Sequence, residues 1–268
     1  MLGHDLSRTF LRNLSGGTVL AFGRDRLDIT NPRQIFDVLR EFRPALVINC
    51  AAYTNVDGAE TERAQARALN VDGPSHLAGA CAELDMALVH FSTDQVFDGS
   101  RETPRQETDP VNPLNYYAQS KLEGEQAVLA FPENLVLRVQ WLYGEKKDRF
   151  TPLRSKEVFT PFSDQIGAPT WTRFLSEQVL ELVKRRASGL FHFSYDDSAS
   201  WAEVYGLVVQ ELGLSTRLEP KKTSEVSLPA KRPLYSVLSN RKLAEFLGRK
   251  GMGSWKESMR EFLHSQRV

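Results

Sequence analysis

The run "ALVHFS" (87–92) is apolar on both of its faces for most of its length, and Thr93 and Asp94 follow it directly. Four runs of similar character occur elsewhere in the chain: "TVLAF" (18–22), "ALVINCA" (45–51), "LVLRV" (135–139) and "LFHFS" (190–194). Strands that are apolar on both faces are typical of a parallel sheet with helices on each side. We therefore expect these runs to form one buried parallel sheet.

Amphipathic stretches between these runs predict helices. The expected helices cover 31–42, 58–84 with a break near Gly73–Pro74, 115–130 and 173–186, and Leu2, Leu6, Phe10 and Leu11 recur at helical spacing near the start of the chain. Strands that alternate with helices favour a doubly wound α/β fold.

The character of the sequence changes after about residue 150, where prolines and basic residues become frequent. Helices are expected there over 200–213, 239–247 and 254–265, separated by loops. We expect a larger domain over residues 1–150 and a smaller helical lobe over most of 151–268, with the strand near 190–194 returning to the main sheet.

Composition excludes several classes of partner. Lysine plus arginine is 34 and aspartate plus glutamate is 34, so the net charge is zero. Nucleic acid and anionic membranes both favour a basic surface, and we expect neither as a partner. No apolar run is long enough to cross a bilayer, and no signal-peptide pattern occurs.

Cys50 and Cys81 lie in apolar stretches without metal-ligand spacing, which predicts buried free thiols in a reducing compartment. We expect a cytoplasmic protein.

Tyr117 and Lys121 lie four residues apart in the predicted helix over 115–130, so they share one face. A lysine ammonium beside a phenol favours the phenolate and lowers the phenol pKa from about 10, which makes tyrosine a usable proton donor. Thr93 ends a predicted strand, and a hydroxyl at the carboxyl end of a parallel strand points into the crevice where ligands bind. It could there hydrogen-bond and polarise a carbonyl oxygen. Each motif alone also fits a surface tyrosine, a solvated lysine or an ordinary strand end, but their order on an alternating background favours a site.

Six motifs in order carry a family resemblance: "NCAAYTNVDGAE" (49–60), "LNVDGPSHLA" (69–78), "VHFSTDQVFDG" (89–99), "PLNYYAQSKLEGE" (113–125), "DQIGAPTW" (164–171) and "KRPLYSVLSNRKL" (231–243). Together they resemble the dTDP-4-dehydrorhamnose reductase family of extended short-chain dehydrogenases. The resemblance implies a Rossmann-like dinucleotide-binding domain over 1–150 and a substrate-binding lobe over 151–268. It implies an NAD(P)H-dependent oxidoreductase that reduces the C4 ketone of a dTDP-4-keto-6-deoxy sugar, such as dTDP-4-dehydro-L-rhamnose to dTDP-L-rhamnose, for cell-surface polysaccharide (O-antigen) precursors.

The resemblance also implies residue roles. Tyr117 would protonate the C4 oxygen, Lys121 would tune it and bind the nicotinamide ribose, and Thr93 would hydrogen-bond the ketone. The remaining cofactor contacts would fall on Gly3, Arg24, Asp28, Ile29, Ala51, Ala52, Tyr53, Thr54 and Asn70. Arg24 is placed to meet a 2′-phosphate, which favours NADPH while leaving NADH open, although a solvated loop arginine is the alternative.

The family places Asp94, Trp141 and the "RP-x2-S" segment (Arg232, Pro233 and Ser236) against the nucleotide sugar. Arg232 could neutralise the charge of a diphosphate, and Trp141 could offer a flat apolar face to the substrate. The alternative for Trp141 is that it packs in the core.

Three of the chain's departures from the family pattern bear on the site and its metal. A first strand and its glycine-rich turn are expected upstream of Met1, and "MLG" resembles the end of that turn. Gln95 stands where many relatives carry an aromatic residue. Asp5 and Glu261 could correspond to two magnesium ligands of some members, but Arg173 occupies the third position and opposes a cation. We therefore expect no metal there, and a monomer or weak dimer.

Two other functions remain open. One is a non-catalytic subunit of the same fold that holds NADP(H), and the other is a reductase that acts on a different nucleotide sugar or gives the opposite C4 epimer. The complete set of Thr93, Tyr117 and Lys121 argues against the first.

Overall fold

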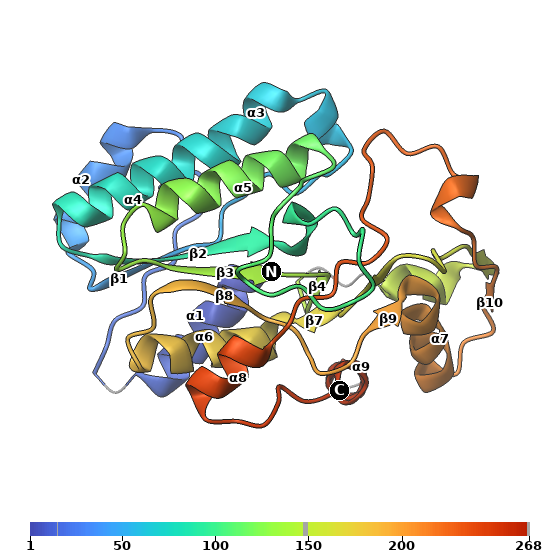
Figure 1. The fold of residues 1–268 in the computed structure, drawn as a ribbon. Helices are drawn as coiled ribbons and strands as arrows, with labels where there is room; N and C mark the ends of the chain where they lie inside the picture. Colours follow the sequence, from blue (N-terminus) through green and yellow to red (C-terminus); the bar gives the residue numbers. More distant parts are fainter. Residues whose placement is uncertain (15, 147–149, 267–268) are drawn as a thin grey trace.

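Four parallel strands form the central sheet in the order β1-β2-β3-β8 (Figure 1). Their bounds are β1 Leu46–Asn49, β2 Ala87–Thr93, β3 Leu135–Val139 and β8 Gly189–His192. The computed structural model describes residues 1–14, 16–146 and 150–266. The α/β fold and four of the five predicted strands are confirmed, including the return of the strand near 190–194 to the main sheet beside β3.

The prediction of a strand over 18–22 is wrong. Among the described residues no strand pairs with this segment, and Leu20 remains 49% exposed. Phe22 instead packs against Phe42, with ring centroids 5.4 Å apart. A strand is stabilised by hydrogen bonds to a neighbouring strand, so an apolar run without such a neighbour has no ladder to join.

Helices cover both faces of the sheet (Figure 1). One face carries α2 (Pro32–Phe42), α3 (Arg63–Arg67), α4 (Gly73–Glu83) and α5 (Tyr116–Leu129), and the other carries α1 (Leu2–Asn13) and α6 (Thr172–Lys184). Leu88 and Val136 pack in the core under α2 and α4, while Val89 and Leu137 pack in the core that includes α1 and α6. Because successive strand residues point to opposite faces, each strand must be apolar on both.

The predicted helix over 58–84 is divided. A 3-10 turn covers Gly58–Glu60, α3 follows, a π-helical turn covers Ala68–Asp72, and α4 begins at Gly73. The expected break near Gly73–Pro74 therefore falls where the π-helical turn joins α4. The backbone stays helical through Gly73, and Pro74 has no N–H to donate to the preceding turn. On α1, Leu11 is 58% exposed and does not belong to the apolar face predicted for it.

The remaining elements build the lobe beside the sheet. They are β4 (Leu142–Tyr143), β5 (Val158–Phe159), β6 (Ile166–Gly167), β7 (Thr170–Trp171), β9 (Ala199–Ser200), β10 (Arg217–Leu218), α7 (Trp201–Leu212), α8 (Arg241–Leu247) and α9 (Trp255–Ser265). The short strands pair as β4 with β7, β5 with β10 and β6 with β9. Phe262 of α9 packs in the same core as Phe10 of α1, so one core extends into both predicted halves.

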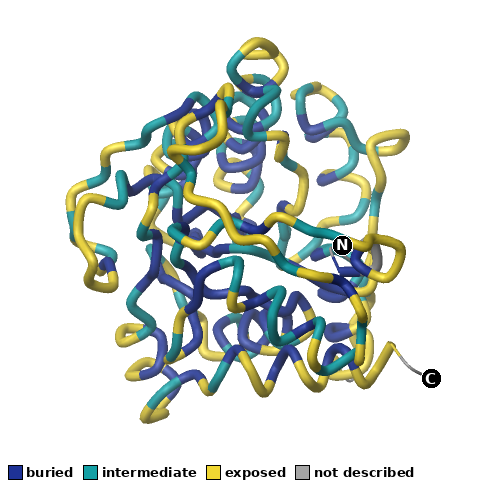
Figure 2. The backbone as a smooth tube through the Cα atoms, turned by 90° about the vertical axis from the view of Figure 1, so that its right-hand side faces the viewer, coloured by how far each residue is buried: buried dark blue, intermediate teal, exposed yellow. Residues whose placement is uncertain are grey.

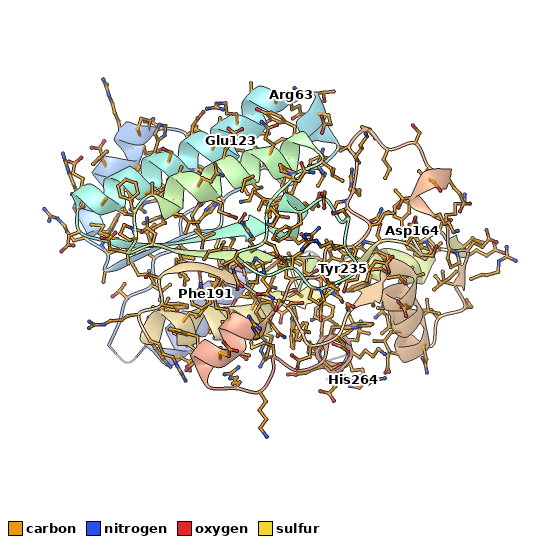
Figure 3. The ribbon with its side chains drawn as sticks, viewed as in Figure 1. Arg63, Glu123, Asp164, Phe191, Tyr235 and His264 are labelled. Atoms are coloured by element: carbon orange, nitrogen blue, oxygen red, sulfur yellow. The ribbon has the colours of Figure 1, made fainter. Side chains whose placement is uncertain are left out.

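Burial follows these layers. Figure 2 shows the buried backbone concentrated inside the molecule and exposed segments at its periphery. Glu123, labelled in Figure 3, lies in the layer of α3, α4 and α5, where it accepts a 3.0 Å hydrogen bond from Nη1 of Arg67. Within the described ranges, no helix combines the length and apolar character needed to span a membrane.

Candidate active site

A cavity of about 630 Å³ opens at the carboxyl ends of β1, β2 and β3. Its lining includes the residues that follow each strand: Ala51, Ala52 and Thr54 after β1, Asp94 and Gln95 after β2, and Gln140 and Trp141 after β3. Parallel α/β sheets place their ligands at this edge because the connecting loops meet there.

Thr93, Tyr117 and Lys121 all line this cavity. Thr93 is the last residue of β2, and the other two lie one turn apart near the start of α5. Asn115 fixes that start, since its Oδ1 accepts a 2.8 Å hydrogen bond from the amide of Ala118. The local signals of a strand end and a capped helix therefore bring the three predicted catalytic residues to one cavity.

The amine of Lys121 is buried and held by the sheet. Its Nζ donates to the carbonyl oxygen of Phe91 at 2.5 Å, and the residue is 3% exposed. Burial lowers the pKa of Lys121 to about 8, while the charge of Glu125 opposes that shift. Glu125 is itself paired with buried Arg138, whose Nε and Nη2 reach its two oxygens at 2.9 and 2.5 Å. Lys121 is thus mostly protonated at neutral pH.

The hydroxyl of Thr93 is engaged with its neighbour. Oγ1 donates to Oδ1 of Asp94 at 3.0 Å and accepts from the amide of Gln95 at 3.2 Å. Asp94 is 2% exposed, and its Oδ2 has no hydrogen-bond partner among the described residues. Burial raises the pKa of Asp94 to about 6. To donate a hydrogen bond to a ketone oxygen in the cavity, the Thr93 hydroxyl has to rotate away from Asp94.

Asn70 positions the loop after β1 from behind. Its Oδ1 accepts from the amide of Tyr53 at 2.9 Å, and its Nδ2 donates to the carbonyl oxygen of Tyr53 and to Oγ of Ser120 at 3.1 and 3.0 Å. Ala51, Ala52 and Thr54 line the cavity, whereas Tyr53 and Asn70 are buried outside its lining. The structure therefore gives Asn70 a supporting position instead of a place on the wall.

The first turn of α1 reaches the cavity at Met1 and Leu2, while Gly3 packs behind them against Cys50. Cys50 also lines the cavity and is exposed, so the prediction that it is buried is wrong, because it follows β1 at the open edge of the sheet. Cys81 is buried and free, as predicted.

Three further predicted cofactor residues, Arg24, Asp28 and Ile29, also lie outside the cavity lining. Arg24 has a side chain that is 71% exposed, and its Nε donates to Oδ2 of Asp28 at 3.1 Å. The amide and hydroxyl of Thr30 donate to Oδ1 of Asp28 and lower its pKa. Ile29 is 6% exposed and packs in the core with Ile35.

On the lobe side, Asp94, Trp141 and Arg232 line the cavity. The indole of Trp141 stacks on that of Trp201, with centroids 3.9 Å apart and planes 10° apart. Trp141 has a positive φ of 47°, which is strained for a bulky residue. Pro233 and Ser236 lie outside the lining, and Ser236 is buried with its amide bonded to the carbonyl oxygen of Ile166.

The sequence interpretation missed part of the wall. Phe159, Phe162, Trp201 and Tyr205 line the cavity from β5, the loop after it and α7. Trp201 and Tyr205 lie four residues apart on α7, a spacing that marks a shared face but equally fits ordinary core packing. The interpretation also missed Asp57, which holds the guanidinium of Arg232 at 2.9 Å.

Two of the residues compared with a magnesium site, Asp5 and Arg173, line one small cavity. Among the described residues, His4, Asp5 and Glu145 bring potential ligand atoms within 4.8 Å of one another. Asp5 already accepts a hydrogen bond from Oγ1 of Thr172, and Arg8 donates to Glu145 at 2.9 Å. The expectation of no bridging metal stays a prediction.

Comparisons with known proteins identify the family. The family model described as the RmlD substrate binding domain matches residues 1–268. A probable dTDP-4,6-dihydroxy-2-methyloxan-3-one 4-ketoreductase of Streptomyces antibioticus is 37% identical over 97% of this chain and 90% of its own length. A dTDP-4-dehydrorhamnose reductase of Mycobacterium tuberculosis is 39% identical over 85% of this chain and 79% of its own.

Solved structures agree with these sequences. A dTDP-4-dehydrorhamnose reductase of Clostridium acetobutylicum has a TM-score of 0.94 at 33% identity, covering 100% of this chain and 96% of its own. The enzyme of the same name from Bacillus anthracis, solved in complex with NADP, has a TM-score of 0.91 at 31% identity, with coverage of 97% and 95%. The predicted resemblance is confirmed: this chain belongs to the dTDP-4-dehydrorhamnose reductase family.

Proposed function

We propose that this chain uses NADPH to reduce the C4 ketone of a dTDP-4-keto-6-deoxy sugar, with dTDP-4-dehydro-L-rhamnose as the leading substrate and dTDP-L-rhamnose as its product. The observation that carries the proposal is the meeting of Thr93, Tyr117 and Lys121 in one cavity. The names of the relatives from Mycobacterium tuberculosis and Clostridium acetobutylicum support the substrate class.

The cavity wall suits a dinucleotide. Ala51 and Ala52 carry small side chains after β1, and the first turn of α1 reaches the same wall at Leu2. Backbone amides at a helix start favour a pyrophosphate. NADPH, when bound, supplies the hydride for C4. The amine of Lys121 donates one hydrogen bond to Phe91, and its other N–H groups are available to the hydroxyls of a ribose.

The protein supplies the proton and the electrostatics. Tyr117 donates its phenolic proton to the C4 oxygen as the C–H bond forms at C4, so the ketone becomes a secondary alcohol. The Lys121 ammonium stabilises the negative charge left on the phenol oxygen. Thr93 turns its hydroxyl from Asp94 to the ketone oxygen and helps to hold the charge that develops there.

The other roles are proposals of the same kind. Arg24 gives up its hydrogen bond to Asp28 and binds the 2′-phosphate of NADPH, and Asp28 and Ile29 lie near the adenine. The wall around the pyrophosphate and ribose is formed or supported by Gly3, Ala51, Ala52, Tyr53, Thr54 and Asn70. Asp94, Trp141 and Arg232 contact the nucleotide sugar. We further propose a dinucleotide-binding domain over 1–150, a substrate lobe over 151–268, a cytoplasmic location, and a monomer or weak dimer without a bridging metal.

The second candidate substrate is dTDP-4-keto-6-deoxy-D-glucose. A Streptomyces niveus relative named for reduction of that sugar is 36% identical over 90% of this chain. The test is to follow NADPH consumption with each sugar in parallel and to assign the C4 configuration of each product by NMR. A higher kcat/KM with the dehydrorhamnose supports the proposal. A folded protein that binds NADPH and reduces neither sugar would contradict the proposal and favour the non-catalytic subunit.

A further inference from the structure

Arg232 reaches the cavity from the lobe and is held there by a carboxylate from the opposite half of the chain. Asp57 lies three residues beyond Thr54 in the loop that lines the cavity after β1. Nη1 and Nη2 of Arg232 donate to Oδ1 and Oδ2 of Asp57, both at 2.9 Å. This two-pronged geometry uses the end of the guanidinium and fixes its plane.

The hydrogen bonds of Arg232 leave one edge of its guanidinium available for a ligand. An arginine has five N–H groups in a rigid fork. Besides the pair to Asp57, Nη1 donates to the carbonyl oxygen of Ala230 at 2.6 Å. The Nε–H and the second N–H of Nη2 lie on one edge of the fork, and neither has a partner among the described residues. Arg232 lines the cavity, and its side chain is 18% exposed.

Asp57 also holds the backbone next to Arg232. The amide of Ala230 donates to its Oδ1 at 3.1 Å, and Nδ2 of Asn115 donates to the carbonyl oxygen of Lys231 at 2.8 Å. The segment therefore rests on the loop after β1 and on the start of α5. Tyr235, labelled in Figure 3, marks the continuation of this segment toward the lobe, where it forms a bridge with Ile166. The hydrogen bonds from Arg232 lower the pKa of Asp57, so its carboxylate is charged at neutral pH.

We propose that Asp57 is the positioning residue for Arg232: it occupies the end of the guanidinium so that the Nε/Nη2 edge binds two oxygens of the nucleotide-sugar diphosphate. The proposal rests on the proposed function and deepens it, because Arg232 alone was expected to meet that diphosphate. Paired N–H donors on a rigid plane match two phosphate oxygens, which a lysine cannot do.

The change in dTDP affinity on removing the charge of Asp57 has opposite signs for a positioning role and for a purely electrostatic one. Asp57 is negative, so its removal makes the neighbourhood more positive and, by charge alone, strengthens binding of an anion. Loss of the fixed guanidinium plane has the opposite effect, because the arginine must then be ordered when the ligand binds. Positioning therefore predicts that an Asp57 variant binds a nucleoside diphosphate more weakly.

The test is a calorimetric titration of dTDP, which needs no catalysis, into the wild type, Asp57→Asn, Arg232→Lys, Arg232→Ala and the double variant Asp57→Asn/Arg232→Ala. We expect about tenfold weaker binding for each conservative variant, the magnitude of one charge-assisted hydrogen bond. In the Arg232→Ala background, Asp57→Asn should change the affinity by less than about twofold, because the coupling has been removed. KM for the sugar should rise about tenfold while kcat and NADPH affinity stay within about twofold.

Glu83→Gln is the matched control. It removes the partner of Arg40 in a surface pair at 3.4 Å, outside the cavity lining, and should change neither dTDP affinity nor KM. Unchanged or tighter dTDP binding by Asp57→Asn overturns the positioning role, and so does an equal loss in the Arg232→Ala background. A wild type that binds no dTDP overturns the proposed function itself.

Discussion

Thr93 and Asp94 carry the polar chemistry at the end of β2. The hydroxyl of Thr93 donates a hydrogen bond to Asp94. The carboxyl group of Asp94 is buried, and its Oδ2 has no hydrogen-bond partner among the described residues. Residues of this kind cost stability, and active sites retain them where their polar atoms are needed by a ligand. The resemblance predicted their place beside the sugar, but the bond between them depends on side-chain rotation that sequence does not specify.

Asp94→Asn should gain stability relative to the wild type as the pH rises. The pKa of Asp94 is raised from 3.8 to about 6 by burial, so the native state holds its proton more tightly than the unfolded state does. That contribution is full below pH 4 and is lost as the pH rises through 6, and the amide variant does not lose it. Chemical denaturation at pH 4 and pH 8 should show a relative gain of up to about 3 kcal/mol. A pH-independent difference would contradict the assignment.

Lys121 predicts an alkaline limit to activity. Burial lowers the pKa of its amine from 10.5 to about 8, and the deprotonated amine no longer stabilises charge on Tyr117. We expect kcat/KM to be level below pH 8 and to fall about tenfold per unit above it, since this ratio reports groups of the free enzyme. Lys121→Met should lower kcat by about 10²–10⁴-fold. A profile that is flat to pH 10 would rule out this role for the ammonium.

At the scale of elements, α5 presents both Tyr117 and Lys121, and its packing sets where they lie. The helix contacts the π-helical turn over Ala68–Asp72 at Gly124. A Cβ atom placed on Gly124 would stand 1.8 Å from the carbonyl oxygen of Asn70, which is backbone and cannot give way cheaply. Glycine at this position allows α5 to approach the π-helical turn that contains Asn70.

Gly124→Ala should therefore destabilise the fold although alanine is the better helix former. We expect a loss of about 1–3 kcal/mol in unfolding free energy, as for an overpacked core, measured by urea denaturation. Gly79→Ala on α4 is the control, because nothing lies within 4 Å of its added Cβ, and it should be neutral or stabilising by up to about 1 kcal/mol. Equal effects of the two changes would refute the close contact of α5.

At the scale of the whole molecule, sequence predicts what is local and periodic. The runs at 45–51, 87–92, 135–139 and 190–194 form strands because both of their faces are buried, and that requirement is visible as continuous apolar sequence. The run at 18–22 is similarly apolar but has no paired strand among the residues that the structure describes, and pairing is a property of the assembled sheet.

Contacts between segments that are distant in the chain could not be predicted from the sequence. Asp57 and Arg232 lie 175 residues apart, and no local pattern links a loop acid after β1 to an arginine in the lobe. The stack of Trp141 on Trp201 is similar, because it depends on how α7 packs beside the segment after β3. The meeting of Thr93, Tyr117 and Lys121 in one cavity was predictable because a strand end and a helix turn fix their places, whereas the surrounding wall depends on tertiary packing.

The central claim is that Tyr117 gives its proton to the C4 oxygen of a nucleotide-linked ketosugar. The most direct test compares NADPH oxidation with dTDP-4-dehydro-L-rhamnose for the wild type and Tyr117→Phe, after titration shows that both bind NADPH. Removal of one hydroxyl should lower kcat by about 10²–10⁴-fold and leave NADPH affinity within about twofold. Equal turnover by Tyr117→Phe and the wild type would contradict the claim.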